Sequence, residues 1–221
     1  MNGENKYGKV LTIVLIIIII AIVGVLGYLG YTALKDKKTK DTYTKAAEEF
    51  EEAVTASSSK ASGSNSTINA ISTDSNSNKA RYLEDYEILG TIQIPKVDLK
   101  CVILNEVTKR SIEIAVAQMY TVNGLNQPGN TVIYGHNYRN SLFFSRNDEL
   151  SNGDIIYITD KTGTKIKYEI FNIFETTSND TTFYTRTSEM TGGKAEVTLS
   201  TCTDDASTTD RRLIIQARQV D

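Results

Sequence analysis

The residues of this chain best suited to covalent chemistry are a cysteine, a histidine and an arginine, each at the edge of an apolar segment. Cys202 closes the pentapeptide TLSTC, directly before the polar stretch Thr203–Asp210. His136 follows an apolar run and a glycine, and Arg212 precedes the apolar run that begins at Leu213. A cysteine acyl-transfer enzyme requires a thiolate, an imidazole that moves protons and a group that stabilises an oxyanion.

Residue counts narrow the alternatives for these groups. The chain holds one histidine and two cysteines. Because there is one imidazole, any mechanism that uses an imidazole must use His136, and a zinc site built on a histidine pair is excluded. We predict no cofactor and no metal. The acidic residues that a calcium site could recruit are interpreted as solvated surface groups: Glu106, Glu113, Asp180 and Glu189.

The overall charge argues against nucleic acid as a partner. The formal net charge of −3 at pH 7 gives no basic field. No run of lysines and arginines with interleaved aromatic residues occurs. The low cysteine count also separates the chain from small disulfide-stapled secreted proteins.

The N-terminal part of the chain carries a membrane-spanning signal. Val10–Leu34 contains no charged residue and exceeds the roughly 20 residues that cross a bilayer as a helix. Tyr28 and Tyr31 near its end suit the membrane–water interface. A cleaved signal peptide is the alternative, but the apolar run is too long for one and no clear small-residue cleavage site follows it. We therefore predict an uncleaved single-pass anchor, with membrane lipid as a partner.

Lysines lie on both sides of this anchor. Lys6 and Lys9 precede it, and more lysines follow it: Lys35, Lys37, Lys38 and Lys40. Taken alone, the positive-inside rule places the part after the anchor inside the cell.

Beyond the anchor, composition divides the chain into a stalk and a folded domain. Lys45–Val54 (KAAEEFEEAV) has the alanine and glutamate content of a short solvated helix. Ser57–Lys79 is dominated by serine and asparagine and holds little to bury, which is typical of a flexible segment. We predict a short N-terminal segment at 1–9, an anchor at 10–34, a flexible stalk at 35–80 and a folded domain at 81–221.

From about Arg81 the sequence has the texture of short strands. Cys101 alternates with Leu99 and Ile103, so we expect it on the apolar face of a strand, in the core. One helix is predicted after a Thr108 cap, with these residues on one face: Ile112, Ala115, Val116 and Met119. Many short strands with one clear helix favour a closed or nearly closed β-barrel.

Side-chain alternation along the last two predicted strands orients the candidate groups. In the strand that ends at Cys202, Val197 and Leu199 form the inward set, so Cys202 faces outward. The inward set of the last strand is Leu213, Ile215 and Ala217. Arg212 then faces outward and Arg211 the opposite way. If the two strands are neighbours, Arg212 can reach a carbonyl under attack by Cys202.

Taken together, these segments resemble the sortases, the Gram-positive enzymes that attach surface proteins to the cell wall. TLSTC is similar to the TLxTC signature of that family, and His136 lies in a similar strand-end setting. Arg212 followed by LIIQA resembles the family's arginine before an apolar strand. The resemblance covers Ile88–Val220, and the anchor and stalk also fit it. It implies a mainly β fold, a closed eight-stranded sortase-type barrel with one or two short helices after an N-terminal transmembrane helix.

The resemblance also implies a cysteine transpeptidase. Cys202 is expected to attack the Thr–Gly carbonyl of an LPxTG-like sorting signal and form a thioester. His136 is expected to protonate the departing amine and deprotonate the incoming one, and Arg212 to bind the substrate or the oxyanion. The implied partners are surface proteins with LPxTG-like signals and an amine acceptor on peptidoglycan or a pilin. The implied location is the cell membrane, with the N-terminal segment 1–9 in the cytoplasm and 81–221 as the catalytic domain outside, and we follow this over the lysine count.

The subclass indicators conflict. The pair His136-Asn137 is similar to class B sortases. The short stretch Glu175–Glu196 lacks the long helical insertion common in class B and is closer to class A or D.

Two rival functions remain open on the sequence. A cysteine peptidase would use the same catalytic residues and pass the acyl group to water. A non-enzymatic stalked surface-binding module would join Cys101 and Cys202 in a disulfide that closes a long loop. Strand parity argues against that bridge because it places the two cysteines on opposite faces.

Overall fold

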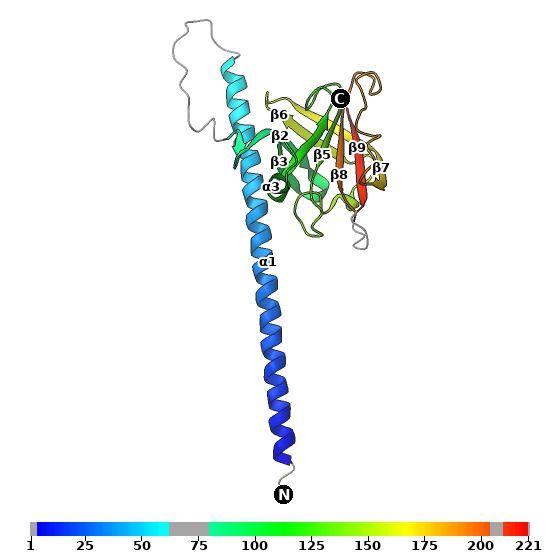
Figure 1. The fold of residues 1–221 in the computed structure, drawn as a ribbon. Helices are drawn as coiled ribbons and strands as arrows, with labels where there is room; N and C mark the ends of the chain where they lie inside the picture. Colours follow the sequence, from blue (N-terminus) through cyan, green and yellow to red (C-terminus); the bar gives the residue numbers. More distant parts are fainter. Residues whose placement is uncertain (1–3, 62–79, 204–209, 221) are drawn as a thin grey trace. The chain divides into compact units, whose positions relative to one another are not determined.

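The computed structural model of the chain describes residues 4–61, 80–203 and 210–220. Its helices are α1 (Glu4–Ala61) and α3 (Lys109–Ile114), with 3₁₀ turns at Pro95–Val97 and Asn147–Glu149 (Figure 1). Its strands are β1 (Tyr82–Leu83), β2 (Tyr86–Ile94), β3 (Leu99–Leu104), β4 (Val116–Thr121), β5 (Gly129–Tyr134), β6 (Ile155–Asp160), β7 (Lys165–Thr177), β8 (Ala195–Cys202) and β9 (Arg211–Gln219). The chain divides into two compact units, Met1–Thr39 and Lys40–Asp221.

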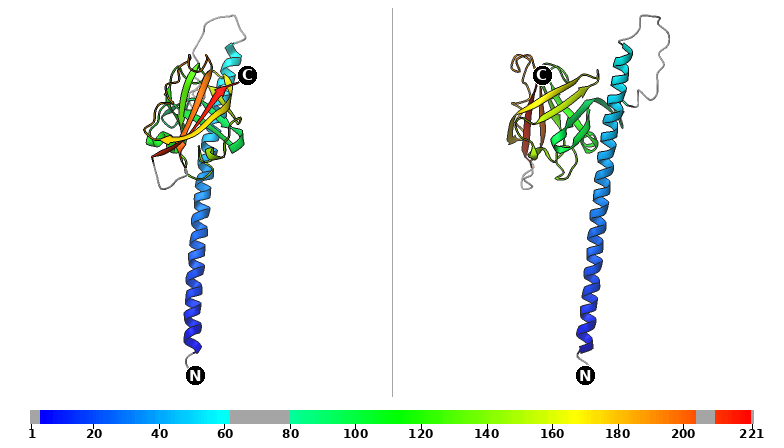
Figure 2. Two further views of the ribbon diagram at one scale, coloured as in Figure 1. Left: turned by 90° about the vertical axis from the view of Figure 1, so that its right-hand side faces the viewer. Right: turned by 180° about the vertical axis from the view of Figure 1, so that it is seen from behind.

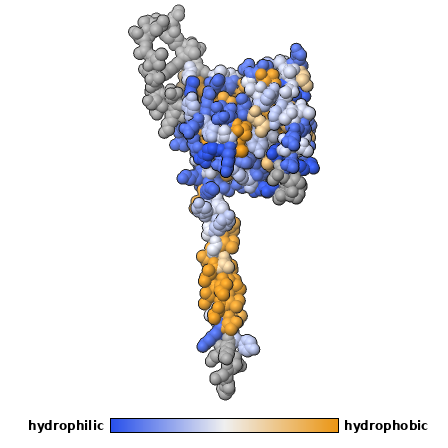
Figure 3. Space-filling view, viewed as in Figure 1, coloured by the Kyte–Doolittle hydropathy of each residue, from blue (hydrophilic) through white to orange (hydrophobic). Residues whose placement is uncertain are grey.

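The first unit is the apolar part of α1. A candidate membrane span runs over Tyr7–Ser57, with a mean hydropathy of 3.3 in its most apolar window and none of that window buried. Hydrophobic side chains cover this helix on the face seen in Figure 3. A helix that is apolar on all sides needs an apolar environment such as a bilayer. This agrees with the predicted membrane anchor.

The second unit contains a closed β-barrel. Its strands follow one another in the order β2–β3–β4–β5–β8–β9–β7–β6, and β6 pairs back with β2 to close the ring. The two-residue β1 pairs with β2 outside this ring. Strand β8 lies between β5 and β9, and these strands run side by side in all three views (Figures 1 and 2). The predicted eight-stranded barrel is therefore confirmed.

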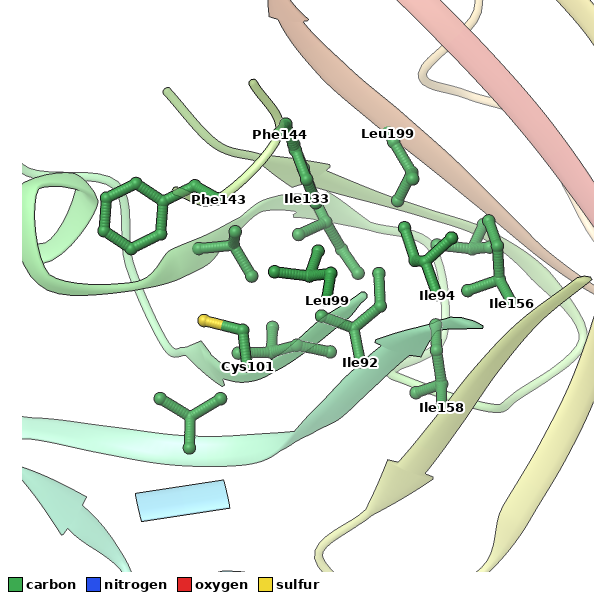
Figure 4. Close-up of a cluster of buried hydrophobic side chains, with 14 of the residues drawn as sticks. Ile92, Ile94, Leu99, Cys101, Ile133, Phe143, Phe144, Ile156, Ile158 and Leu199 are labelled. Atoms are coloured by element: carbon green, nitrogen blue, oxygen red, sulfur yellow. The ribbon is translucent and has the colours of Figure 1, made fainter. Parts of the chain in front are cut away.

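Branched aliphatic residues from most strands fill the barrel. Figure 4 shows the sulfur of Cys101 among Ile92, Leu99 and Phe143. Cys101 is completely buried, which confirms its predicted core position. Both Cys101 and Cys202 are free thiols, so the disulfide required by the binding-module alternative is not formed.

The predicted helix after Thr108 is present but shorter than expected. The Thr108 cap is confirmed, because its hydroxyl accepts a 3.0 Å hydrogen bond from the Ser111 N–H in a capping box. The helix ends at Ile114, and Val116–Thr121 forms β4 instead. The extension through Met119 was therefore wrong: the chain after Ile114 joins the sheet beside β3.

The part of α1 beyond Lys40 packs on the barrel. One face of this part is buried: Tyr43, Ala47, Phe50 and Val54. On the same segment, Glu51 accepts a 2.6 Å hydrogen bond from Thr91 of β2 and forms a 3.0 Å ion pair with Lys100 of β3. The expectation of a solvated helix at Lys45–Val54 was wrong. This segment is helical, but its apolar residues, together with Tyr43 upstream, form one face that is buried on the barrel. Residues 62–79 of the predicted stalk lie outside the described part of the chain.

Candidate active site

Cys202 and Arg212 face each other across two neighbouring strands. Strands β8 and β9 are antiparallel, and Cys202 is the register partner of Arg212. The predicted inward residues of both strands lie in or against the main core: Val197, Leu199, Leu213, Ile215 and Ala217. Arg212 lines a surface pocket, together with Ser200 from the outward face of β8. The two strands are neighbours, which meets the condition set by the sequence analysis, and Arg212 lies on the face expected from side-chain parity.

His136 lies at the end of the strand on the other side of β8. Strands β5 and β8 are parallel with Tyr134 opposite Ser200, and the Gly135 N–H donates to the Ser200 carbonyl at 3.2 Å, so the pairing continues up to the residue before His136. The Thr201 hydroxyl donates to the Gly135 carbonyl at 2.7 Å, and the Asn137 amide donates to the Cys202 carbonyl at 3.1 Å. These two bonds tie the histidine-bearing chain to the cysteine-bearing strand.

Gly135 permits a close approach just before the histidine. A Cβ at this position would lie 2.7 Å from the Phe144 ring and 2.9 Å from the Val116 side chain. Real Cβ atoms essentially never come so close to another side chain. Glycine therefore allows the loop after His136 to fold tightly against the strand end.

Tyr134 is a site residue that the sequence reasoning missed. Its hydroxyl lies 3.7 Å from the Cys202 sulfur, and its ring centroid is 6.3 Å from that of His136. Burial, followed by the nearby Cys202 charge, raises the pKa of Tyr134 to about 12. The phenol is therefore protonated at neutral pH and can donate to a thiolate. The signal in the sequence was proximity, because Tyr134 ends the strand two residues before His136.

The two neighbouring arginines have different surroundings. Arg211 forms a 2.5 Å ion pair with Glu175 of β7, and both side chains are about half exposed. Arg212 is less exposed. Burial raises the pKa of Tyr134 and of Tyr184, and the positive charge of Arg212 opposes that rise. The guanidinium that belongs to the pocket is that of Arg212.

The electrostatics of His136 favour a neutral imidazole. Burial lowers the pKa of His136, and the negative charge of Glu113 on α3 acts in the opposite direction. His136 is half-buried. Its ring centroid is 4.7 Å from that of Tyr138, which follows it along the chain.

The pocket that Tyr134, Ser200 and Arg212 line has a volume of about 280 Å³. One wall comes from the segment after β7, which includes Phe183 and Tyr184. Phe183 belongs to a second hydrophobic cluster with Val132 of β5 and Ile214 of β9. This cluster lies on the outward face of the strands, so the segment after β7 covers part of that face. This segment has no apolar periodicity by which the wall could have been predicted.

Polar contacts hold this wall in place. The amide of Asn130, which is completely buried, donates to the carbonyls of Phe183 and Tyr184 at 3.0 and 3.2 Å. The side-chain Oδ1 of Asn130 accepts a 2.9 Å hydrogen bond from the Thr198 hydroxyl. Further along the segment, Arg186 forms a 2.6 Å ion pair with the buried Glu196 of β8. Residues 178–194 are all described and contain turns but no helix, as the sequence suggested for this stretch.

The residues that the structure describes contain no cluster of three or more His, Cys, Asp or Glu side chains that could hold a metal ion. Asp180 instead accepts hydrogen bonds from the hydroxyls of Thr176 and Thr182, both at 2.6 Å.

Comparison with known families identifies this arrangement. A model of the sortase domain matches residues 92–220, which include all three predicted site residues. The chain belongs to the sortase family. Sortases are cysteine transpeptidases of the cell wall, and the barrel described above is their fold.

Solved sortase structures share the fold at low sequence identity. A sortase D5 transpeptidase from Clostridium perfringens is 24% identical, with a TM-score of 0.58, over 82% of this chain and 99% of that one. Sortase A from Corynebacterium diphtheriae is 21% identical, with a TM-score of 0.55, over 89% and 95%. Sortase C-1 from Actinomyces oris is 20% identical, with a TM-score of 0.54, over 79% and 99%. Among curated protein sequences, none matches this sortase.

Proposed function

We propose that this sortase cleaves an LPxTG-like sorting signal through a thioester on Cys202 and transfers the acyl group to an amine. The observation that carries the proposal is that Cys202 lies opposite Arg212, with its sulfur 3.7 Å from the Tyr134 hydroxyl, and that both of these partners line one pocket. The Cys202 carbonyl is also hydrogen-bonded to the residue after His136. A nucleophile, an acid–base group and a fixed cation then converge where an extended peptide can enter.

The residues divide the work of two acyl transfers. The Cys202 thiol passes its proton to the neutral His136 imidazole, and the sulfur attacks the carbonyl of the scissile Thr–Gly bond. The resulting oxyanion is stabilised by the Arg212 guanidinium. As the tetrahedral intermediate collapses, the C–N bond breaks and His136 in its protonated form gives a proton to the departing amine. The incoming amine then loses a proton to His136 as it attacks the thioester, and Cys202 leaves as the thiolate.

Tyr134 assists the nucleophile in this scheme. Its hydroxyl is within 3.7 Å of the sulfur and stays protonated at neutral pH, so it donates to the thiolate before attack and to the leaving thiolate after acyl transfer. A hydrogen bond from this phenol stabilises negative charge on the sulfur while the nucleophile forms and while it departs.

The proposed acyl donors are surface proteins with LPxTG-like signals, and the acceptor is an amine of peptidoglycan or a pilin. This requires the catalytic unit to lie outside the cell, with α1 as a single-pass anchor and the N-terminus inside. The apolar character of α1 supports the anchor. The fold of the second unit, shared with sortases of classes A, C and D, supports a substrate at the cell surface.

The test uses the full-length chain in detergent with a peptide that contains LPxTG. Intact-mass measurement is expected to show an acyl adduct on Cys202, and added triglycine is expected to convert hydrolysed product into ligated product. Hydrolysis that persists unchanged at high triglycine would instead identify a cysteine peptidase. If neither an adduct nor any cleavage is found with LPxTG and with permuted sorting peptides, the proposed substrate class is wrong.

A further inference from the structure

Four aromatic rings connect the barrel-packed part of α1 to His136. Tyr43 of α1 lies with its ring centroid 5.3 Å from that of Phe143. Phe143 is 6.0 Å from Tyr138, and Tyr138 is 4.7 Å from His136. Each separation lies in the range of about 4.5 to 7 Å at which aromatic rings interact favourably.

The loop that carries the two middle rings is tightly held. The backbone of Asn137 bridges to Phe143, and the Phe144 N–H donates to the His136 carbonyl at 3.1 Å. The Tyr138 N–H donates to the Ser145 hydroxyl at 2.9 Å. The loop therefore folds back on itself directly after the histidine, and a displacement of Phe143 is passed to the His136 backbone.

Phe143 occupies a backbone conformation that needs external support. Its φ is 50°, in the left-handed region that is costly for a bulky residue. Its side chain is only 3% exposed. A strained conformation persists when its surroundings over-determine it, and the ring of Tyr43 is one of those surroundings.

Tyr43 is itself fixed by contacts on both sides along α1. Lys40 forms a 2.7 Å ion pair with Asp98, and the Thr44 hydroxyl donates to the Lys100 carbonyl at 3.2 Å. Tyr43 is completely buried. The helix therefore presents one ring in a defined place against the loop that carries Phe143.

We propose that Tyr43 is a positioning residue for His136 and acts through Phe143 and Tyr138. This rests on the proposed function in that His136 is taken as the acid–base group. In this proposal the part of α1 that packs on the barrel, through Tyr43, determines the position of the His136 imidazole. Loss of the Tyr43 ring releases Phe143 and Tyr138 and lets the imidazole sample positions away from Cys202.

The single histidine allows a direct test without substrate. In the full-length chain in detergent, isotope-labelled histidine gives one imidazole signal, from His136. The variant Tyr43→Leu is expected to shift and broaden that signal and to raise the pKa of His136 toward its ordinary value, because a looser imidazole is better hydrated. Other titratable groups near the ring are Glu113 on α3, Tyr134, Tyr138, and Cys202 and Arg212 at the ends of the adjoining strands.

Two further variants separate positioning from stability. Phe50→Leu makes the same kind of change two helical turns away, at a residue 1% exposed that forms no ring pair within the described part of the chain. It is expected to lower stability to a similar extent and leave the His136 signal and pKa as in the wild type. Tyr43→Phe keeps the ring and is expected to restore the wild-type signal. A His136 signal unchanged in Tyr43→Leu, or changed equally in Phe50→Leu, overturns the proposal.

Kinetics with the LPxTG peptide give a second readout. Tyr43→Leu is expected to lower kcat by about tenfold to a hundredfold, the scale of a small misplacement from a remote mutation, with KM nearly unchanged. If Tyr43→Leu does not fold, Phe143→Leu removes the ring that lies between Tyr43 and Tyr138 and is expected to shift the His136 signal. An unshifted signal in Phe143→Leu also overturns the proposal. If the wild type turns over no peptide, the proposed function fails, whereas the imidazole signal still decides the role of Tyr43.

Discussion

At the scale of single residues, the two cysteines differ in the face of the strand that each occupies. Cys101 is completely buried among core side chains, and burial raises the pKa of its thiol to about 12. Cys202 is half-buried beside the pocket. We predict that Cys202→Ala abolishes peptide cleavage, whereas Cys101→Ala lowers the free energy of unfolding by about 0.5–3 kcal/mol and keeps cleavage near the wild-type rate. Urea unfolding and peptide turnover measure the two effects. Turnover by Cys202→Ala would contradict the mechanism.

The neighbouring arginines provide a matched pair for a second prediction. Arg212→Ala is expected to lower kcat by at least about a hundredfold, the scale of losing one oxyanion donor. Arg211→Ala is expected to have little effect, because it removes only a half-exposed ion pair with Glu175. Arg212→Lys should recover part of the loss, since an ammonium lacks the planar fork. A larger defect in Arg211→Ala would reverse the assignment.

His136 predicts a pH dependence of stability. Burial lowers the pKa of His136 in the folded state. In the unfolded chain the pKa of a histidine is about 6.5. The unfolded chain therefore binds more protons when the pH falls below about 6.5, and acidification lowers the free energy of unfolding. We predict that His136→Gln lacks this component of the acid destabilisation. Urea denaturation at pH 7.5 and pH 5.5 tests it, and an identical change with pH in both proteins would show that His136 is not desolvated.

Residue-level prediction from the sequence succeeded where strand parity decides the outcome. Period-two alternation correctly placed Cys101 inside and put Cys202 and Arg212 on the outward face. It did not indicate Tyr134, because an apolar run such as Thr131–Tyr134 is buried on both faces and shows no alternation.

At the scale of elements, the errors came from apolar spacing that fits more than one structure. Val116 and Met119 fit a helical face, but the backbone from Ala115 is extended and Val116 pairs with β3. Short apolar runs do not distinguish a helix from a strand, and the tertiary pairing decides. The buried face with Tyr43 and Phe50 was not predicted, because these residues lie among many charged residues in the sequence and the segment therefore resembled a solvated helix.

The segment after β7 yields a prediction about substrate binding. Asn130→Ala removes the donors that hold the carbonyls of Phe183 and Tyr184, which costs about 1–3 kcal/mol per buried group left unpaired. Because this segment forms a pocket wall, KM for the peptide is expected to rise by about tenfold, equivalent to about 1.4 kcal/mol, with a smaller change in kcat.

Asn126→Ala is the matched control for that variant. Asn126 is also buried and also donates to two backbone carbonyls, those of Ile158 and Thr164, but it holds the β6–β7 hairpin. It is expected to lower stability and leave KM unchanged. Equal KM values in the two variants would show that Asn130 supports the fold and not the pocket wall.

At the scale of the whole molecule, the order of strands in the barrel explains why local patterns sufficed for the site. The strand β8 lies between β5 and β9, so residues at the ends of three strands meet although they are far apart in the sequence. The sequence left this adjacency open, because the pairing of strands depends on long-range contacts. The packing of the chain beyond Lys40 on the barrel depends on long-range contacts and was not predicted.

The orientation of the molecule in the membrane is the last prediction. The lysine count and the proposed function place the catalytic unit on opposite sides, and the two thiols can decide between them. A membrane-impermeant maleimide reacts with accessible thiolate, so Cys202 is expected to be labelled and the buried Cys101 is not. In intact cells we expect labelling of the wild type and of Cys101→Ala, and none of Cys202→Ala. Labelling that requires lysis would place the catalytic unit inside, as the lysines alone indicate, and would remove cell-surface proteins from its substrates.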